Sequence, residues 1–254
     1  MPQRGGGLSM DRVDELKEKL ALACRLLYRE GLMDHAGLAG ARVPGDGRLV
    51  LNPRTMRGTR GRHPGILCAE DMVVVDRDGR KIDGVNDPPS ETPIFTGVFR
   101  SRSDMHACFH LHLPWATLFS TIGRPLVPIF SLAAVFGEKV PVHPDPNLIQ
   151  SDAQGKAVAK SLGKARAVIL RSHGAVIVGE DIETVFTASV LFEENAKRLY
   201  NASLLGRPRA LKGKELREIV KRTWNEKVIQ KIWNFYILRA QEEGWLSGAG
   251  PIAR

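Results

Sequence analysis

The sequence predicts a single α/β domain, because predicted strands alternate with predicted helices and neither a long linker nor an internal repeat interrupts them. The chain of 254 residues is long enough to bury a substantial core. Its 43% apolar and 26% charged residues are close to the average of folded proteins. We expect residues 1–8 to be a flexible tail and residues 9–254 to form the domain, which ends in a helical segment over about 212–245.

In the first half, apolar residues at alternating steps of three and four predict a helix over 11–29. Short runs between turn residues predict strands at 48–51 and 72–75. A helix over about 92–102 and a buried strand over 105–112, ended by Pro114, follow.

The second half repeats this alternation. Residues 152–162 are expected to be helical, 167–170 and 175–178 to be strands, and 181 to about 204 to be a long helix. A further amphipathic helix is predicted over 214–243.

The formal net charge of +9 is typical either of nucleic-acid binding or of a site that attracts small anions. Basic residues are interspersed with acidic ones and no nucleic-acid-binding module is recognisable, so we expect a small anionic substrate and no nucleic-acid partner. No stretch approaches the roughly 18 to 20 apolar residues of a membrane span. The N-terminus also lacks the apolar core of a signal peptide, which predicts a cytoplasmic protein without a membrane partner.

The segment that contains His110 and His112 is the most informative in the chain. Residues two apart in a strand point to the same face, about 6.5 to 7 Å from each other, so both imidazoles could reach one ion. His173 follows the predicted strand 167–170 and is a third candidate ligand. The alternative is that these are structural histidines satisfied by hydrogen bonds.

Glu91 directly precedes the helix predicted over 92–102. Its carboxylate could cap that helix or face a pocket. Beside a metal, a carboxylate can ligate the ion or act as a general base. The residues themselves leave these roles open.

Taken together, Pro89-Ser90-Glu91, His110-Leu111-His112 nineteen residues after Glu91, and Ser172-His173-Gly174 resemble the class II aldolase/adducin family. The resemblance runs from the first predicted helix to about residue 204. It implies a three-layer α/β/α domain around a central, largely antiparallel sheet. It also implies a ring-shaped homo-oligomer, a tetramer or a multiple of one, with sites between subunits.

The resemblance further implies one divalent metal ion per subunit, bound by His110, His112 and His173, with Glu91 as the acid/base and in some members a fourth ligand. Three imidazoles suit zinc, manganese, iron or cobalt. Such sites stabilise an enolate or enediolate. They support aldol cleavage, epimerisation and dehydration of sugar phosphates, and decarboxylation of hydroxylated aromatic acids.

The sequence departs from the family at the positions that hold phosphate. Sugar-phosphate members carry a Gly-Asn-x-Ser turn, whereas this chain has Leu38 and Gly40 at the Asn and Ser positions after Gly37. The usual paired serines before the Glu are reduced to Pro89-Ser90. The chain therefore lacks several of the hydrogen-bond donors with which sugar-phosphate members of the family hold a phosphate.

A basic loop over 52–63 offers a partial replacement, because a guanidinium can bind a carboxylate in two-pronged fashion. The alternative is a solvated basic loop. We predict substrate contacts from His35, Gly37, Ser90 and Arg54; the loop also carries Arg57, Arg60 and Arg62.

These patterns predict a divalent-metal-dependent carbon–carbon lyase that decarboxylates a hydroxylated, including aromatic, carboxylic acid or cleaves an aldol. The first alternative is an aldolase, epimerase or dehydratase that acts on a sugar phosphate. The second is a non-catalytic, adducin-like interaction module. Retention of three histidines and Glu91 argues against that module, because a chain without a metal has no physical need for them.

Overall fold

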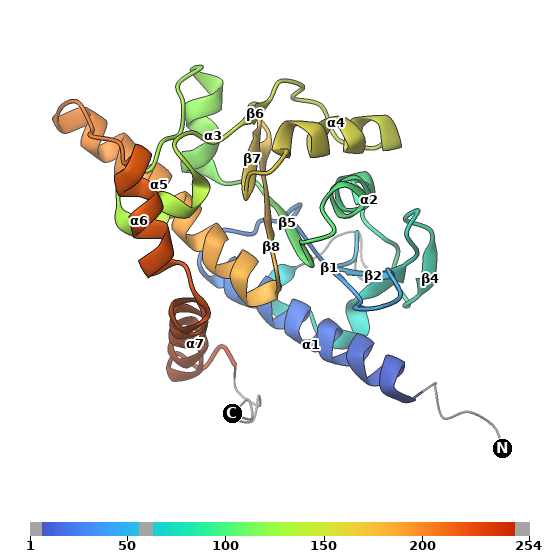
Figure 1. The fold of residues 1–254 in the computed structure, drawn as a ribbon. Helices are drawn as coiled ribbons and strands as arrows, with labels where there is room; N and C mark the ends of the chain where they lie inside the picture. Colours follow the sequence, from blue (N-terminus) through green and yellow to red (C-terminus); the bar gives the residue numbers. More distant parts are fainter. Residues whose placement is uncertain (1–6, 56–62, 247–254) are drawn as a thin grey trace.

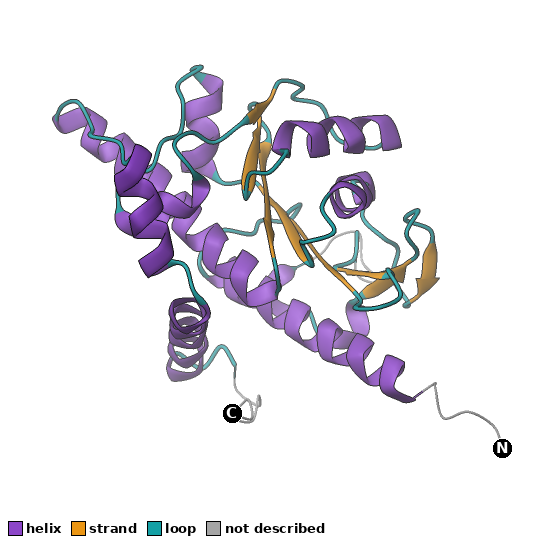
Figure 2. Ribbon diagram, viewed as in Figure 1, coloured by secondary structure: helices purple, strands orange, loops and turns teal. Residues whose placement is uncertain are grey.

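The computed structural model describes residues 7–55 and 63–246, with side chains from Arg12 onward. These residues form a central sheet with helices on both faces (Figures 1 and 2). The predicted three-layer α/β/α architecture with a largely antiparallel sheet is confirmed. Within the described ranges, none of the helices has the length and apolar content that a bilayer crossing requires.

The strands are β1 (Leu38–Arg42), β2 (Leu49–Leu51), β3 (Val73–Val75), β4 (Lys81–Asp83), β5 (Ala107–Leu111), β6 (Val142–His143), β7 (Ala167–Leu170) and β8 (Gly174–Gly179). The α-helices are α1 (Gly7–Arg29), α2 (Thr92–Ser101), α3 (Pro114–Thr121), α4 (Asp152–Leu162), α5 (Ile182–Leu205), α6 (Gly213–Thr223) and α7 (Glu226–Glu242). Three short 3-10 helices are η1 (Pro64–Ile66), η2 (Ala69–Asp71) and η3 (Ser131–Phe136).

The strand order is β4-β3-β2-β1-β5-β8-β7-β6, and every neighbouring pair is antiparallel except β6 and β7. Strand β5 lies between β1 and β8, so it is hydrogen-bonded on both sides. In this register Leu38 of β1 and Val176 of β8 flank His110. The most informative segment of the sequence is therefore in the middle of the sheet.

The two faces of the sheet carry separate apolar cores. The larger core contains residues of α1, α3, α5 and α7 together with Ala107, Phe109 and Leu111 of β5. The smaller core contains residues of α2 and α4 together with Cys108. Because side chains alternate along a strand, His110 points to the same face as Cys108, the face that α2 and α4 cover.

Helices α2 and α4 cross in direct backbone contact. A Cβ atom added at Gly155 would lie 2.1 Å from the carbonyl oxygen of Pro93, and one added at Gly97 would lie 2.5 Å from the backbone of Gly155. Only glycine permits this approach. The crossing holds the first turn of α2, and with it Glu91, against the segment that leads into α4.

Several elements differ from their sequence-based predictions. Helix α1 begins at Gly7, so residues 7 and 8 are helical, whereas residues 1–6 of the expected tail lie outside the described part. Strand β5 is shorter than predicted and ends at Leu111. Pro114 also begins helix α3, which was not predicted, because its fixed φ suits the first helical turn.

Strand β1 was missed because its sequence, LAGAR, contains no β-branched or aromatic residue. The single helix predicted over 214–243 is wrong: the chain forms α6 and α7 with a break at Trp224 and Asn225. The Asn225 side chain accepts a hydrogen bond from the N–H of Val228 and so starts a new helix.

Candidate metal centre

His110 is held rigidly inside the sheet. Its side chain has no exposed surface, and its Nδ1 lies 3.2 Å from the carbonyl oxygen of Ala175 in β8. A carbonyl oxygen can only accept, so Nδ1 carries the proton and donates it. The lone pair of the imidazole therefore lies on Nε2, which faces the cluster.

His112 lies just beyond the end of β5, and its side chain is 22% exposed. Its Nδ1 is 3.0 Å from Oδ2 and 3.2 Å from Oδ1 of Asp34. A carboxylate is an acceptor, so this nitrogen also carries the proton and Nε2 has the free lone pair. Burial alone would raise the pKa of Asp34, but the hydrogen bonds from His112 and from the N–H groups of Ala36 and Gly37 outweigh it and lower the pKa well below its ordinary value.

His173 comes from the tight turn between β7 and β8. Its backbone N–H donates to the carbonyl of Leu170, and Ser172 before it has φ = 56°, in the left-handed region. The next residue, Gly174, packs so closely that an added Cβ would lie 2.6 Å from the carbonyl oxygen of Leu111. The turn can therefore bring His173 against the end of β5 only because residue 174 has no side chain.

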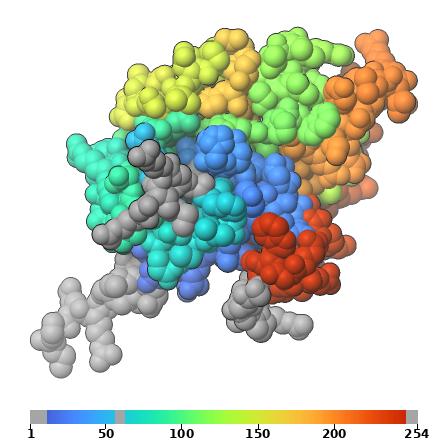
Figure 3. Space-filling view, turned by 180° about the vertical axis from the view of Figure 1, so that it is seen from behind, coloured from blue at the N-terminus to red at the C-terminus, as the bar shows by residue number. Residues whose placement is uncertain are grey.

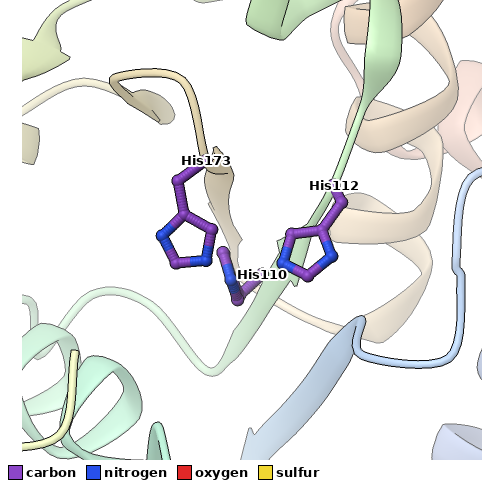
Figure 4. Close-up of side chains that lie close together, drawn as sticks. All are labelled: His110, His112 and His173. Carbon is purple, nitrogen blue, oxygen red and sulfur yellow. The ribbon is translucent and has the colours of Figure 1, made fainter. Parts of the chain in front are cut away.

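The three imidazoles converge on one point, as Figure 4 shows. One ring nitrogen from each histidine can be chosen so that all three lie within 4.8 Å of one another. The Nε2 atoms of His110, His112 and His173 are buried without a hydrogen-bond partner among the described residues. Buried polar atoms are rarely left unpaired, so these orphaned nitrogens fit a divalent cation bound by three imidazoles.

The electrostatic environment favours the form of histidine that binds metal. Burial lowers the pKa of His110 well below its ordinary value, and the neighbouring His112 and His173 lower it further. Burial also lowers the pKa of His173, against the opposite effect of Glu91. Neutral imidazoles offer lone pairs to a metal, whereas protonated ones do not.

Glu91 occupies the N-cap position of α2, but its side chain does not cap that helix. The carboxylate is buried; Oε1 accepts a hydrogen bond from the N–H of Ile149 at 2.8 Å and lies 4.0 Å from Nε2 of His173. Its other oxygen, Oε2, lies 3.7 Å from Nε2 of His110. The structure thus brings Glu91 and all three predicted ligands together.

The predicted substrate contacts lie at different depths. Gly37 is buried and donates its N–H to Asp34, whereas His35 and Ser90 are exposed. Arg54 is exposed, and its backbone N–H donates to the carbonyl of Asp87 at 2.9 Å, which ties its loop to the segment before Ser90. Arg57, Arg60 and Arg62 lie outside the described residues.

Sequence reasoning missed two groups at this site. The partner of His112, Asp34, is 78 positions away in the sequence, and no spacing rule connects them. The partner of Glu91 is the backbone N–H of Ile149, which carries no side-chain signal. A local clue to Asp34 does exist, since an Asp three residues before a Gly is typical of a turn that the carboxylate caps.

Comparisons with known proteins find relatives of this chain in both sequence and fold. The model of the Class II Aldolase and Adducin N-terminal domain matches residues 18–200. A 5-deoxy-D-ribulose 1-phosphate aldolase of Bacillus thuringiensis serovar kurstaki is 28% identical over 60% of this chain and 71% of that protein. A 3,4-dihydroxyphthalate decarboxylase of Arthrobacter keyseri is 29% identical over 66% of this chain and 70% of that protein.

Among solved structures, an L-fuculose 1-phosphate aldolase from Glaciozyma antarctica PI12 superposes with a TM-score of 0.78 and is 20% identical over 96% of each chain. At that identity the likeness concerns the fold.

Proposed function

Because this chain belongs to the class II aldolase and adducin family, we propose that it is a divalent-metal-dependent carbon–carbon lyase that decarboxylates a hydroxylated carboxylic acid. The aldolases and decarboxylases to which it is similar are lyases, and so is this enzyme. The observation that carries the proposal is the convergence of His110, His112 and His173 beside the buried carboxylate of Glu91.

We propose one cation per subunit, zinc, manganese, iron or cobalt, held by the three histidines. When bound, it would act as a Lewis acid that stabilises negative charge on a substrate oxygen. The chain itself supplies the neutral, oriented imidazoles and excludes water from His110, which has no exposed surface.

Glu91 would move the proton. Its Oε1 is engaged by the N–H of Ile149, so Oε2 is the atom left to hold a proton. When the carbon–carbon bond to the carboxylate breaks, carbon dioxide leaves and the remaining carbon keeps the electron pair. That carbon then takes a proton from Oε2 of Glu91, which must hold one before the bond breaks and regains one from solvent afterwards, so that the net change is loss of carbon dioxide and uptake of one proton.

The surroundings of His110 favour a hydroxylated acid over a sugar phosphate. Leu38 pairs with His110 in the β1–β5 ladder, so its buried side chain lies on the same face of the sheet. A Cβ at Gly40 would lie 2.5 Å from the side chain of Leu51, which leaves no room for a serine. Buried apolar side chains therefore stand where sugar-phosphate members of the family carry polar groups, and they offer a phosphate no hydrogen-bond donor.

We propose that the substrate is a small anion whose carboxylate meets Arg54, with His35, Gly37 and Ser90 as further contacts. The exposure of the Arg54 side chain and the hydrogen bond from its backbone to the segment before Ser90 support this assignment. Aldol cleavage is the second candidate, because the relatives include an aldolase as well as a decarboxylase. The two differ in product, carbon dioxide or an aldehyde.

We also propose a homo-oligomer, a tetramer or a multiple of one, with the site at a subunit interface. The carboxyl end of α5 projects from the body of the molecule (Figures 1 and 3), and its Leu204 and Leu205 are 70% and 93% exposed. Apolar side chains on a projecting helix end suit burial against another subunit. Light scattering of the parent and of Leu205→Glu tests this: a monomeric parent contradicts the proposal.

Metal content tests the proposed function directly. We expect about one ion per chain in the purified parent and its loss in His110→Ala, His112→Ala and His173→Ala. The matched control is His106→Ala, because His106 is exposed and precedes the same strand. A folded parent that binds no metal when supplied with it would contradict the proposal. Metal-loaded enzyme is then assayed for carbon dioxide from hydroxylated aromatic acids and for aldehyde from ketose phosphates.

A further inference from the structure

The carboxylate of Asp34 connects one histidine of the cluster to the turn before β1. Its Oδ1 accepts hydrogen bonds from the N–H groups of Ala36 and Gly37, at 2.9 and 2.8 Å. Its Oδ2 lies 3.0 Å from Nδ1 of His112. One side chain thus closes the turn and binds the imidazole at the same time.

This turn is anchored independently of His112. The Asn52 side chain is completely buried; its Nδ2 donates to the carbonyl of Gly37 at 3.3 Å, and its Oδ1 accepts from the N–H of Ala39 at 2.9 Å. The position of Asp34 is therefore set by the scaffold of β1 and β2. The carboxylate can act as a fixed support for the imidazole.

His112 needs a support that His110 does not. His110 lies within β5, is fully buried and donates to a backbone carbonyl of the neighbouring strand. His112 lies outside β5 and is more exposed than the other two histidines. A residue beyond the ladder has no strand hydrogen bonds to fix its direction, so its ring orientation depends on what its side chain contacts.

We infer that Asp34 is a positioning residue of the metal centre: it holds Nδ1–H of His112 so that Nε2 presents its lone pair to the cation. This inference rests on the proposed function, since it assigns a role toward the same ion. A group that receives the second ring N–H of a metal-bound histidine sets the tautomer and the ring direction, and its loss typically weakens metal binding about 10- to 100-fold.

Two substitutions separate the contributions of Asp34. Asp34→Ala removes every contact, so we expect the largest loss of Zn²⁺ affinity, in the range of about 10- to 100-fold. Asp34→Asn keeps the oxygen that accepts from the turn, but it places an NH2 group, which only donates, where Oδ2 accepts from Nδ1–H of His112. Its affinity for Zn²⁺ should fall although the turn is kept.

A turn elsewhere in the chain offers a matched control. Asp76, in the turn that joins β3 to β4, also accepts two backbone N–H groups, those of Asp78 and Arg80 at 2.8 and 2.9 Å. It lies toward the β4 edge of the sheet, away from β5. Asp76→Ala, the match of Asp34→Ala, removes these turn contacts and should lower the midpoint of urea unfolding with no change in Zn²⁺ affinity.

The experiment measures the Zn²⁺ dissociation constant of the full chain by competition with a chelator, for the parent and the three variants. In parallel, imidazole NMR of the metal-free proteins reports the tautomer of His112, which should be Nδ1–H in the parent and mixed in Asp34→Ala. That readout does not depend on metal or on turnover. A turn contact with no role at His112 would leave it unchanged.

Weaker Zn²⁺ binding in both Asp34 variants and a mixed tautomer in Asp34→Ala, with Asp76→Ala unaffected in both measurements, support the inference. Parental affinity in a folded Asp34→Ala, or an unchanged tautomer, overturns it while the proposed function stands. A parent that binds no Zn²⁺ overturns the proposed function, and the positioning role with it.

Discussion

Oε2 of Glu91 lies 3.7 Å from Nε2 of His110, close enough to share a site and too far for a hydrogen bond between them. The carboxylate is held in place by the N–H of Ile149 and not by the helix that it precedes. A group at the N-terminus of a helix thus faces the histidine cluster.

Glu91→Gln should abolish proton transfer while it preserves the site. The amide oxygen can still accept from Ile149, so we expect the fold and the metal content to persist. Turnover should fall by about 10²- to 10⁴-fold, the usual contribution of a general acid or base. Steady-state kinetics and elemental analysis of the same preparation check this. Near-parental turnover would remove Glu91 from proton transfer, and parallel loss of metal would make it a ligand.

Gly174→Ala should damage the metal centre. The new Cβ would lie 2.6 Å from the carbonyl oxygen of Leu111 and 3.1 Å from ring carbons of both His110 and His112. We expect a loss of about 1 to 3 kcal/mol in the free energy of unfolding, as for overpacking, together with weaker metal binding. Urea unfolding and chelator competition measure the two effects.

Gly123→Ala is the control for that variant. Gly123 has φ = +67° and open space around it, so an alanine there meets backbone strain and no clash. It should destabilise the fold by about 1 kcal/mol and leave metal affinity unchanged. Equal metal affinity in both glycine variants would contradict the proposal that the close packing of Gly174 against Leu111 is needed for the metal centre.

Gly155→Ala tests the crossing of α2 and α4. Alanine would gain about 1 kcal/mol from its helix propensity, but its Cβ would lie 2.1 Å from the carbonyl oxygen of Pro93. A backbone carbonyl cannot rotate away, so we expect the steric clash to outweigh the gain in helix propensity. The free energy of unfolding should fall by at least about 1 to 3 kcal/mol. The control Lys156→Ala, at an exposed neighbour, should change stability by less than about 0.5 kcal/mol. A more stable Gly155→Ala would refute the close contact.

Glu193, which lies outside the metal centre, should make the stability of the fold depend on pH. Its buried carboxylate accepts the N–H groups of Trp115 and Ala116 at the start of α3, at 2.8 and 3.0 Å. Burial raises the pKa of Glu193, and these hydrogen bonds and the charge of Lys197 oppose the shift without cancelling it. The folded state therefore keeps the proton at pH values at which the unfolded chain has released it.

The contribution of Glu193 to the free energy of unfolding is therefore fully present below the pKa of the unfolded chain, about 4.3. It is lost as the pH rises through the higher pKa of the folded state. Glu193→Gln does not titrate. Its stability relative to the parent should increase across that window by at most about 1.4 kcal/mol per pH unit. Urea unfolding of both proteins at a series of pH values measures the difference, and parallel curves would contradict the shift.

Much of the fold could be predicted because local patterns encode it. The apolar stripes of α1 and α5 and the apolar runs of β7 and β8 are properties of consecutive residues. Strand β1 and the break between α6 and α7 could not be predicted in the same way. The first depends on neighbours on both sides of a run of small residues, and the second on one capping side chain, Asn225.

The sequence by itself determined which residues could form the site: the spacing of His110 and His112 predicts that both lie on one face of a strand, and the motifs around Glu91 and His173 resemble those of the family. Only the tertiary structure decided how they are held. Asp34 meets His112 across 78 positions, and Glu91 turns to the histidines instead of capping α2. The physical reason is that the periodicity of the sequence determines only which side chains share a face of a strand or helix. Strand register and the close crossing of α2 and α4 determine which of these faces pack against each other.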